Sequence, residues 1–218
     1  RSGWVSVFLW KAKLTYVSVP KVACTSIKRM FFEIENGKPF NVFNTNGHMW
    51  HIHNFYKGHA FGDLPHRRIA DHRRLAVVRD PVQRVLSCYS NRVVHHGKLS
   101  AKAAGPALER AGLKPAPDLG EFVDQFEAYR AVSPDVRHHS QSLIRSLGED
   151  PGFYARIYDI RELGAFVADV GAHLGRELVL GRHQTGGPKF TPDDLTAAQR
   201  DRLMQIFAED YRIWGRHF

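Results

Sequence analysis

The sequence has little cysteine, no long apolar run, and fewer acidic than basic residues. Its two cysteines, Cys24 and Cys88, permit one disulfide but not a disulfide framework. The longest apolar runs, such as residues 5–10, are far too short to span a bilayer. No repeat and no low-complexity tract is present, which excludes solenoids, propellers and disordered chain. We therefore expect one globular domain over residues 1–218.

Positive charge is in excess. The chain has 31 Lys and Arg against 22 Asp and Glu, giving a net charge of +9. This is compatible with a solvated basic surface or with an anionic partner: a nucleotide, a nucleic acid or an acidic glycan. Two cysteines without a framework favour a reducing compartment.

Strand and helix patterns alternate along the chain. Apolar, β-branched segments at 14–19, 74–79 and 155–160 indicate buried strands, and apolar residues at helical spacing follow each of them. Asp80 and Pro81 are strong helix-start signals. The pattern predicts an α/β domain around a mainly parallel sheet. Ligands bind at the carboxyl ends of such strands, where the turns at 20–27 and 79–82 lie.

The other segments give weaker signals. We expect residues 40–71 to be irregular with a short helix, and residues 98–117 to be an exposed loop or a loose helix. Asp118 is expected to cap a helix, a single helix is expected to bury residues 136–147, and the last helix is expected to open at Thr191.

The first turn has the composition of an anion-binding loop. Pro20-Lys-Val-Ala-Cys-Thr-Ser-Ile-Lys-Arg29 follows a strand and opens a helix, so its first amides and the hydroxyls of Thr25 and Ser26 suit an anion. Lys21 adds a point charge, and Lys28 and Arg29 add positive field or face solvent. The glycine pattern of P-loop NTPases is absent.

This string resembles the 5′-phosphosulfate loop of sulfotransferases, in particular the carbohydrate-modifying branch. The resemblance implies binding of 3′-phosphoadenosine 5′-phosphosulfate (PAPS), with Lys21 also stabilising charge on the bridging oxygen. Ile27 stands where that branch carries an aromatic residue, so position 27 offers no ring to stack on adenine. The implied loop residues are Lys21, Val22, Ala23, Cys24, Thr25 and Ser26.

The second turn resembles the other signature of the family, Arg-Asp-Pro…Arg…Ser. The resemblance implies that Arg79 and Ser87 bind the 3′-phosphate of PAPS. A guanidinium makes paired hydrogen bonds to phosphate oxygens, and a hydroxyl adds a third. Arg84, on the same side of the helix as Ser87, is a candidate to assist. ATP has no 3′-phosphate, so this pair argues against a kinase, as does the lack of an obvious magnesium-holding carboxylate.

Thirteen histidines compete for the role of general base. Residues 55–61, Phe-Tyr-Lys-Gly-His-Ala-Phe, resemble the stretch holding the catalytic histidine of uronyl 2-O-sulfotransferases, which implies that His59 is the base. A structural role for His59 stays open. His48, His51 and His53 are alternatives. Their cluster also suits a metal site, but sulfuryl transfer needs no metal, which favours structural or substrate-facing roles.

A loop at 182–191 lies where sulfotransferases carry a lid over the nucleotide. The resemblance implies cofactor contacts from Arg182, Gly186 and Gly187. Taken over nearly the whole chain, it implies a P-loop-NTPase-like three-layer fold, adenosine 3′,5′-bisphosphate as product, and a carbohydrate acceptor, either acidic or lipid-linked. It implies no nucleic acid partner.

Two other functions stay open. A small-molecule kinase with a degenerate phosphate loop would need magnesium and ignore a 3′-phosphate. A non-catalytic binder of anionic glycan or nucleic acid would have an affinity that falls as the bulk salt concentration rises. The Ala- and Arg-rich composition favours a bacterial, cytoplasmic enzyme, and a Golgi enzyme with an anchor before residue 1 is the alternative.

Overall fold

The computed structural model describes residues 6–56, 60–181, 183 and 186–218. The chain divides into two compact units, and we describe each by itself. Unit 1 comprises Arg1–Val78, Leu143–Gln184 and Arg216–Phe218, and unit 2 comprises Arg79–Ser142 and Thr185–Gly215. No helix within the described ranges has both the length and the apolar character needed to cross a membrane.

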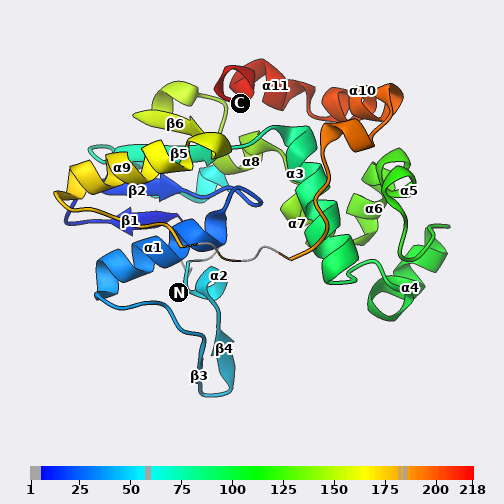
Figure 1. Cartoon of the computed structure of the whole chain (residues 1–218), viewed down its shortest axis with the longest axis horizontal. Helices are drawn as coiled ribbons and strands as arrows, with labels where there is room; N and C mark the ends of the chain where they lie inside the picture. The colour runs from blue at the N-terminus through cyan, green and yellow to red at the C-terminus, as the bar shows by residue number, and fades with distance from the viewer. Residues whose placement is uncertain (1–5, 57–59, 182, 184–185) are drawn as a thin grey trace. The chain divides into compact units, whose positions relative to one another are not determined.

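A four-stranded sheet forms the centre of unit 1, in the order β1-β2-β5-β6 (Figure 1). Its strands are β1 (Val7–Leu9), β2 (Leu14–Val17), β5 (Arg73–Val78) and β6 (Arg156–Asp159). The three strands β2, β5 and β6 pair in parallel, and β1 pairs antiparallel to β2. The predicted α/β class with a mainly parallel sheet is confirmed, and β1 adds an edge strand that the sequence patterns did not predict.

Two helices cover one face of this sheet, α1 (Cys24–Asn36) and α9 (Leu163–Leu174). Side chains alternate between the faces along a strand, so Tyr16 of β2 points toward both helices. Its ring lies 5.7 Å from that of Phe31 on α1 and 5.6 Å from that of Phe166 on α9. All three rings are buried, so they fix both helices on the sheet.

The opposite face carries the neighbouring residues of the same strands. Thr15 hydrogen bonds to His72 at 2.8 Å, and both side chains are buried. Arg74 donates to the carbonyls of Ile69 at 2.9 Å and Phe153 at 2.6 Å. These bonds attach the irregular chain around β5 to the sheet.

Shorter elements complete unit 1. They are the hairpin strands β3 (Phe43–Thr45) and β4 (His48–Trp50), the helices α2 (Ile52–Phe55) and α8 (Leu143–Leu147), and 3-10 turns at Phe61–Asp63, His66–Ile69, Pro151–Phe153, Ile160–Glu162 and Gly215–His217. The β3–β4 hairpin lies in the segment expected to be irregular with a short helix. Outside the hairpin, the described residues of that segment form the short helix α2, 3-10 turns and irregular chain, as expected. Residues 41–49 are all exposed, so no alternation of apolar and polar residues marks the two strands.

Unit 2 is helical. Its helices are α3 (Pro81–Cys88), α4 (Ala101–Arg110), α5 (Leu119–Asp124), α6 (Phe126–Val132), α7 (Pro134–His139), α10 (Ala197–Ile206) and α11 (Ala208–Trp214), with a π-helix at Tyr89–His95 and a 3-10 turn at Pro192–Asp194. Its core gathers apolar side chains from most of these helices, among them Val85, Phe122, Phe126 and Leu203, all 0% exposed.

One predicted helix start is confirmed, and two predicted helices differ from the structure. Asp118 caps α5 with a capping box, as predicted. The single helix expected over 136–147 is two helices, because the chain leaves helical geometry between Ser140 and Ser142. Thr191 opens only a 3-10 turn, and Thr196 caps the following helix, α10.

Candidate active site

The first strand-to-helix junction adopts a strained backbone. Between the end of β2 and the start of α1, Lys21 and Ala23 have φ angles of 66° and 57°, in the left-handed region that favours glycine. Val22, between them, has no positive φ. Alternation of this kind turns successive N–H groups toward one point and makes an anion-binding concavity. Strain in non-glycine residues is kept where it serves a site.

The start of α1 supplies further donors to this junction. Ala23 is the N-cap, no side chain caps the helix, and its first turn holds no acidic residue. The amides of the first turn therefore present partial positive charge without a carboxylate from the protein. Both features suit a bound phosphate or sulfate group.

Two buried hydroxyls lie in the first turn of α1. Thr25 is 7% exposed and its Oγ1 lies 2.8 Å from Nε2 of His53. Ser26 is 6% exposed and its Oγ accepts from the backbone N–H of His183 at 3.1 Å. Thr25 therefore contacts a side chain of α2, and Ser26 contacts the backbone of the segment after α9.

The other loop positions divide between core and surface. Val22 and Ile27 are 0% exposed, so position 27 is a core position. Cys24 is half-buried, and no disulfide joins it to Cys88.

Lys28 is buried rather than solvent-facing. It is 2% exposed, its Nζ donates to the carbonyl of Tyr56 at 2.8 Å, and Nδ1 of His53 lies 3.5 Å away. Burial lowers the pKa of Lys28, and the nearby Cys24 opposes that shift. Arg29 donates to the carbonyl of Phe40 at 3.1 Å and stacks over that ring. Both residues therefore hold structure around the loop.

The second junction joins β5 to α3. Asp80 caps α3 by accepting from the backbone N–H of Gln83 at 2.9 Å, and it also accepts from the hydroxyl of Tyr211 at 2.8 Å. Arg79 is half-buried and its Nε donates to Gln83 over a long 3.4 Å. Ser87 is half-buried, two turns along the same helix. The junction therefore presents a guanidinium and a hydroxyl.

Arg84 does not share that exposure. It is 1% exposed and donates to the carbonyl of Gln141 at 2.8 Å. Burial lowers the pKa of Arg84 to about 10, opposed by the nearby carboxylate of Asp210. Arg84 holds the non-helical residues 140–142 against α3 through Gln141, so the structure gives it a packing role.

Comparison with known families decides between the functions left open by the residues alone. Residues 7–142, more than half of the chain, match the family model described as "Sulfotransferase family". The chain belongs to the sulfotransferase family. The sulfotransferase is therefore an enzyme that transfers a sulfuryl group, and neither a kinase nor a non-catalytic binder. No curated protein and no solved structure matches it.

Two of the predicted site residues of the sulfotransferase, His59 and Arg182, lie outside the described residues. Their roles as base and lid residue stay predictions. Of the alternative bases, His51 is exposed, His48 packs edge-on against Trp50, and His53 contacts the loop. No group of three or more His, Cys, Asp or Glu side chains within the described ranges is placed to hold a metal.

The predicted glycine pair packs closely on the π-helix of unit 2. A Cβ on Gly186 would lie 2.7 Å from Nε2 of His95, and one on Gly187 would lie 2.6 Å from the carbonyl oxygen of Ser90. Gly187 also has a φ of 100°. Ser90 donates to the carbonyl of Pro188 at 2.5 Å. Glycine is required at position 187 for close approach of the loop to the helix, whereas the contact at Gly186 is with the end of a side chain.

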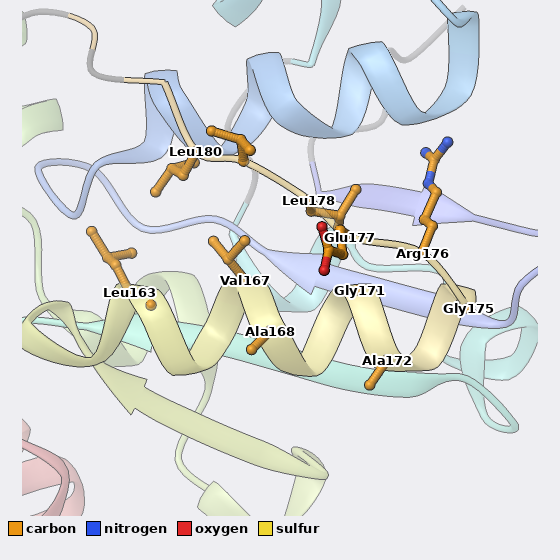
Figure 2. A pocket seen from close by; sticks show the side chains of 12 residues that line it. Leu163, Val167, Ala168, Gly171, Ala172, Gly175, Arg176, Glu177, Leu178 and Leu180 are labelled. Carbon is orange, nitrogen blue, oxygen red and sulfur yellow. The ribbon is translucent and has the colours of Figure 1, made fainter.

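The segment after α9 leads back to the phosphate loop. Figure 2 shows residues 176–180 running along α9 and enclosing an apolar groove with it, whose volume is about 890 Å³. A Cβ on Gly171 would lie 2.6 Å from the carbonyl oxygen of Arg176, so glycine is needed for this approach. None of the predicted site residues lines the groove. Its relevance to the site is that the segment ends at His183, the backbone donor to Ser26.

Sequence patterns missed three of these contacts. They gave no sign that His53 pairs with Thr25, that Lys28 is buried beside His53, or that His183 bonds to Ser26. The partners are far apart in the sequence, and only the fold brings them together. The one available signal was the density of histidine at 48–53, just after the loop helix.

Proposed function

We propose that this sulfotransferase takes its sulfuryl group from PAPS and transfers it to a hydroxyl of a carbohydrate acceptor. The observation that supports the donor most strongly is the uncapped start of α1 behind the alternating backbone of Lys21 and Ala23. That concavity suits a 5′-phosphosulfate. The proposal includes a P-loop-like three-layer fold over one domain spanning residues 1–218.

Each residue group has a defined part in this proposal. Lys21 and the amides of residues 22–26 hold the phosphosulfate, and Arg79 and Ser87 hold the 3′-phosphate. In the reaction the bond between sulfur and the bridging phosphate oxygen breaks while a bond from sulfur to the acceptor oxygen forms. Lys21 stabilises the negative charge on the departing oxygen. His59 takes the proton of the acceptor hydroxyl. No metal takes part.

The β3–β4 hairpin supports a carbohydrate acceptor. It presents Phe43 at 41% and Met49 at 46% exposure, and the Phe43 and Trp50 rings stack with centroids 6.0 Å apart. Aromatic faces with one polar end suit sugars, whose rings have both apolar and hydroxyl-bearing sides. The chain runs directly from Trp50 into α2, which carries His53 to the phosphate loop.

Calorimetric titration with adenosine 3′,5′-bisphosphate tests the donor. We expect tight binding to the wild type, much weaker binding of 5′-AMP, and loss of that preference in Arg79→Ala. The matched control is Arg202→Ala, which removes one positive charge from the exposed face of α10. Equal, weak binding of both nucleotides to the wild type would contradict PAPS as donor.

Steady-state kinetics tests the acceptor. With PAPS and a panel of acidic and neutral oligosaccharides, Trp50→Ala should raise the KM for the active oligosaccharide by roughly fivefold to tenfold, because a ring contact is lost. The KM for PAPS should not change. Trp10→Ala, at an exposed tryptophan of unit 1, is the control. An unchanged oligosaccharide KM in Trp50→Ala would remove the hairpin from the acceptor site.

A further inference from the structure

Three side chains form a continuous polar chain behind the phosphate loop, all within unit 1. Nζ of Lys28 lies 3.5 Å from Nδ1 of His53, and Nε2 of the same ring lies 2.8 Å from Oγ1 of Thr25. Lys28 and Thr25 come from α1, and His53 comes from α2, which packs beside it (Figure 1). Lys28 is 2% exposed and Thr25 is 7% exposed, so water screens these contacts little.

The chemistry of the three groups fixes the direction of the hydrogen bonds. An ammonium has three donors and no acceptor, so the ring nitrogen facing Lys28 must be the acceptor. Nδ1 of His53 is then unprotonated, and its neutral ring carries the hydrogen on Nε2. A doubly protonated ring would place a second positive charge beside Lys28, which disfavours it. Nε2–H therefore donates to Oγ1 of Thr25.

The protonation state of the His53 ring determines how the hydroxyl of Thr25 can form hydrogen bonds. Because Oγ1 accepts from His53, the hydrogen of this hydroxyl is directed to an acceptor other than that ring. Thr25 lies in the first turn of α1, which follows directly on the left-handed residues Lys21 and Ala23 and has no side-chain cap. An anion held there offers only acceptors.

We propose that His53 is a positioning residue, held by Lys28 in the Nε2–H tautomer so that the Thr25 hydroxyl donates to the anion in the loop. The ligand class is the 5′-phosphate or phosphosulfate of a nucleotide, so the proposal rests on the proposed donor. A ring held in this way has its basic nitrogen on Lys28. His53 is therefore not the general base.

A double-mutant cycle tests this coupling. Binding of adenosine 3′,5′-bisphosphate is measured by calorimetry for the wild type, His53→Ala, Thr25→Val and the double variant. We expect each single change to weaken binding by roughly tenfold or more, as for a charge-assisted hydrogen bond. In the Thr25→Val background, His53→Ala should change the affinity by less than about threefold. If the loss of affinity in the double variant equals the product of the two single losses, the two residues act independently and the proposal is overturned.

His53→Gln is the conservative control. Its side-chain amide keeps an N–H donor for Thr25, so it should recover most of the affinity that His53→Ala loses. Thermal melting of every variant is recorded beside the titrations. Loss of affinity in His53→Gln equal to that in His53→Ala, with both melting as the wild type does, would also overturn the proposal.

The tautomer is measured without any ligand. Long-range ¹H–¹⁵N correlation spectra of the wild type, with the His53 signals assigned by their loss in His53→Gln, should show Nε2 protonated and Nδ1 unprotonated. A ring protonated at Nδ1 would refute the proposal whatever affinities the variants show. If the bisphosphate does not bind the wild type while the spectra show the Nε2–H form, the proposed donor fails and the Lys28–His53–Thr25 arrangement stands.

Discussion

The junctions after β2 and after β5 follow neighbouring parallel strands of one sheet, yet their helices start differently. At the first, α1 begins at an alanine in left-handed geometry, and no side chain caps it. At the second, α3 begins with the Asp80 carboxylate on the amide of Gln83 and with Pro81 in its first turn. The first helix start leaves its partial positive charge for an external anion, and the second neutralises it internally.

Under the proposed function, this difference gives the two junctions different ways of binding an anion. An uncapped helix start can bind an anion through its backbone amides, which do not depend on the side chains present. At such a site, hydroxyls and one lysine only add to the binding. A capped start recognises an anion only through side chains that extend from it. Arg79 and Ser87 are the side chains of that kind at the second junction. Strand-end position alone therefore does not define how a phosphate is bound.

The largest effect should come from the lysine of the uncapped junction. Lys21→Ala should lower kcat by about 10²- to 10³-fold, because it removes a donor from charge that develops in the transition state. Single-turnover rates with saturating PAPS measure this loss directly. Lys38→Ala, an exposed lysine of the same unit, serves as control. A rate within threefold of wild type would show that Lys21 does not touch the reacting group.

A carboxylate cap at the first junction, like the one at the second, should weaken anion binding there. Ala23→Asp places a carboxylate at the N-cap of α1, where it competes with a ligand anion for the same amides. Affinity for adenosine 3′,5′-bisphosphate should fall by roughly tenfold to a hundredfold through repulsion. Ala23→Asn keeps the size without the charge and should bind more tightly than Ala23→Asp. Equal affinities would mean that the start of α1 is not the anion site.

Removing the cap of the second junction should lower stability, and this effect should be smaller than the two effects above. Asp80→Ala removes the cap of α3 and the acceptor for Tyr211, which should lower the free energy of unfolding by about 1–2 kcal/mol. The expected fall in Tm is about 2–4 °C for each kcal/mol. Asp80→Asn keeps a capping oxygen and should retain most of the stability. Identical melting of the alanine and asparagine variants would show that the cap contributes nothing.

The two junctions were predictable because local chemistry marks them. Asp80-Pro81 predicts a helix start, and the apolar run at 14–19 before Pro20 predicts a buried strand, which is β2 in the structure. Gly37, with a φ of 66°, ends α1 in the left-handed geometry that glycine favours at this position. These signals lie within a few residues of the feature that they predict.

Features that depend on distant partners were not predictable. The hairpin at 43–50 was missed because its residues are almost all exposed, and β1 was missed because three residues carry no period. The buried state of Lys28 depends on Tyr56 and His53, contributed by another helix and the residue after it. Burial reverses the ordinary expectation for a lysine, and nothing in the neighbouring residues indicates it.

The order of strands in the sheet also has a consequence for how the chain folds. Leu75 of β5 pairs with Arg156 of β6, and the first part of unit 2, Arg79–Ser142, lies between them in the sequence. The last strand therefore joins the sheet only after a long loop has closed, at an entropic cost that grows with the logarithm of loop length. Such separation slows folding. During synthesis β5 emerges with one edge unpaired until β6 arrives, and that interval is when the chain is most exposed to pairing with another copy.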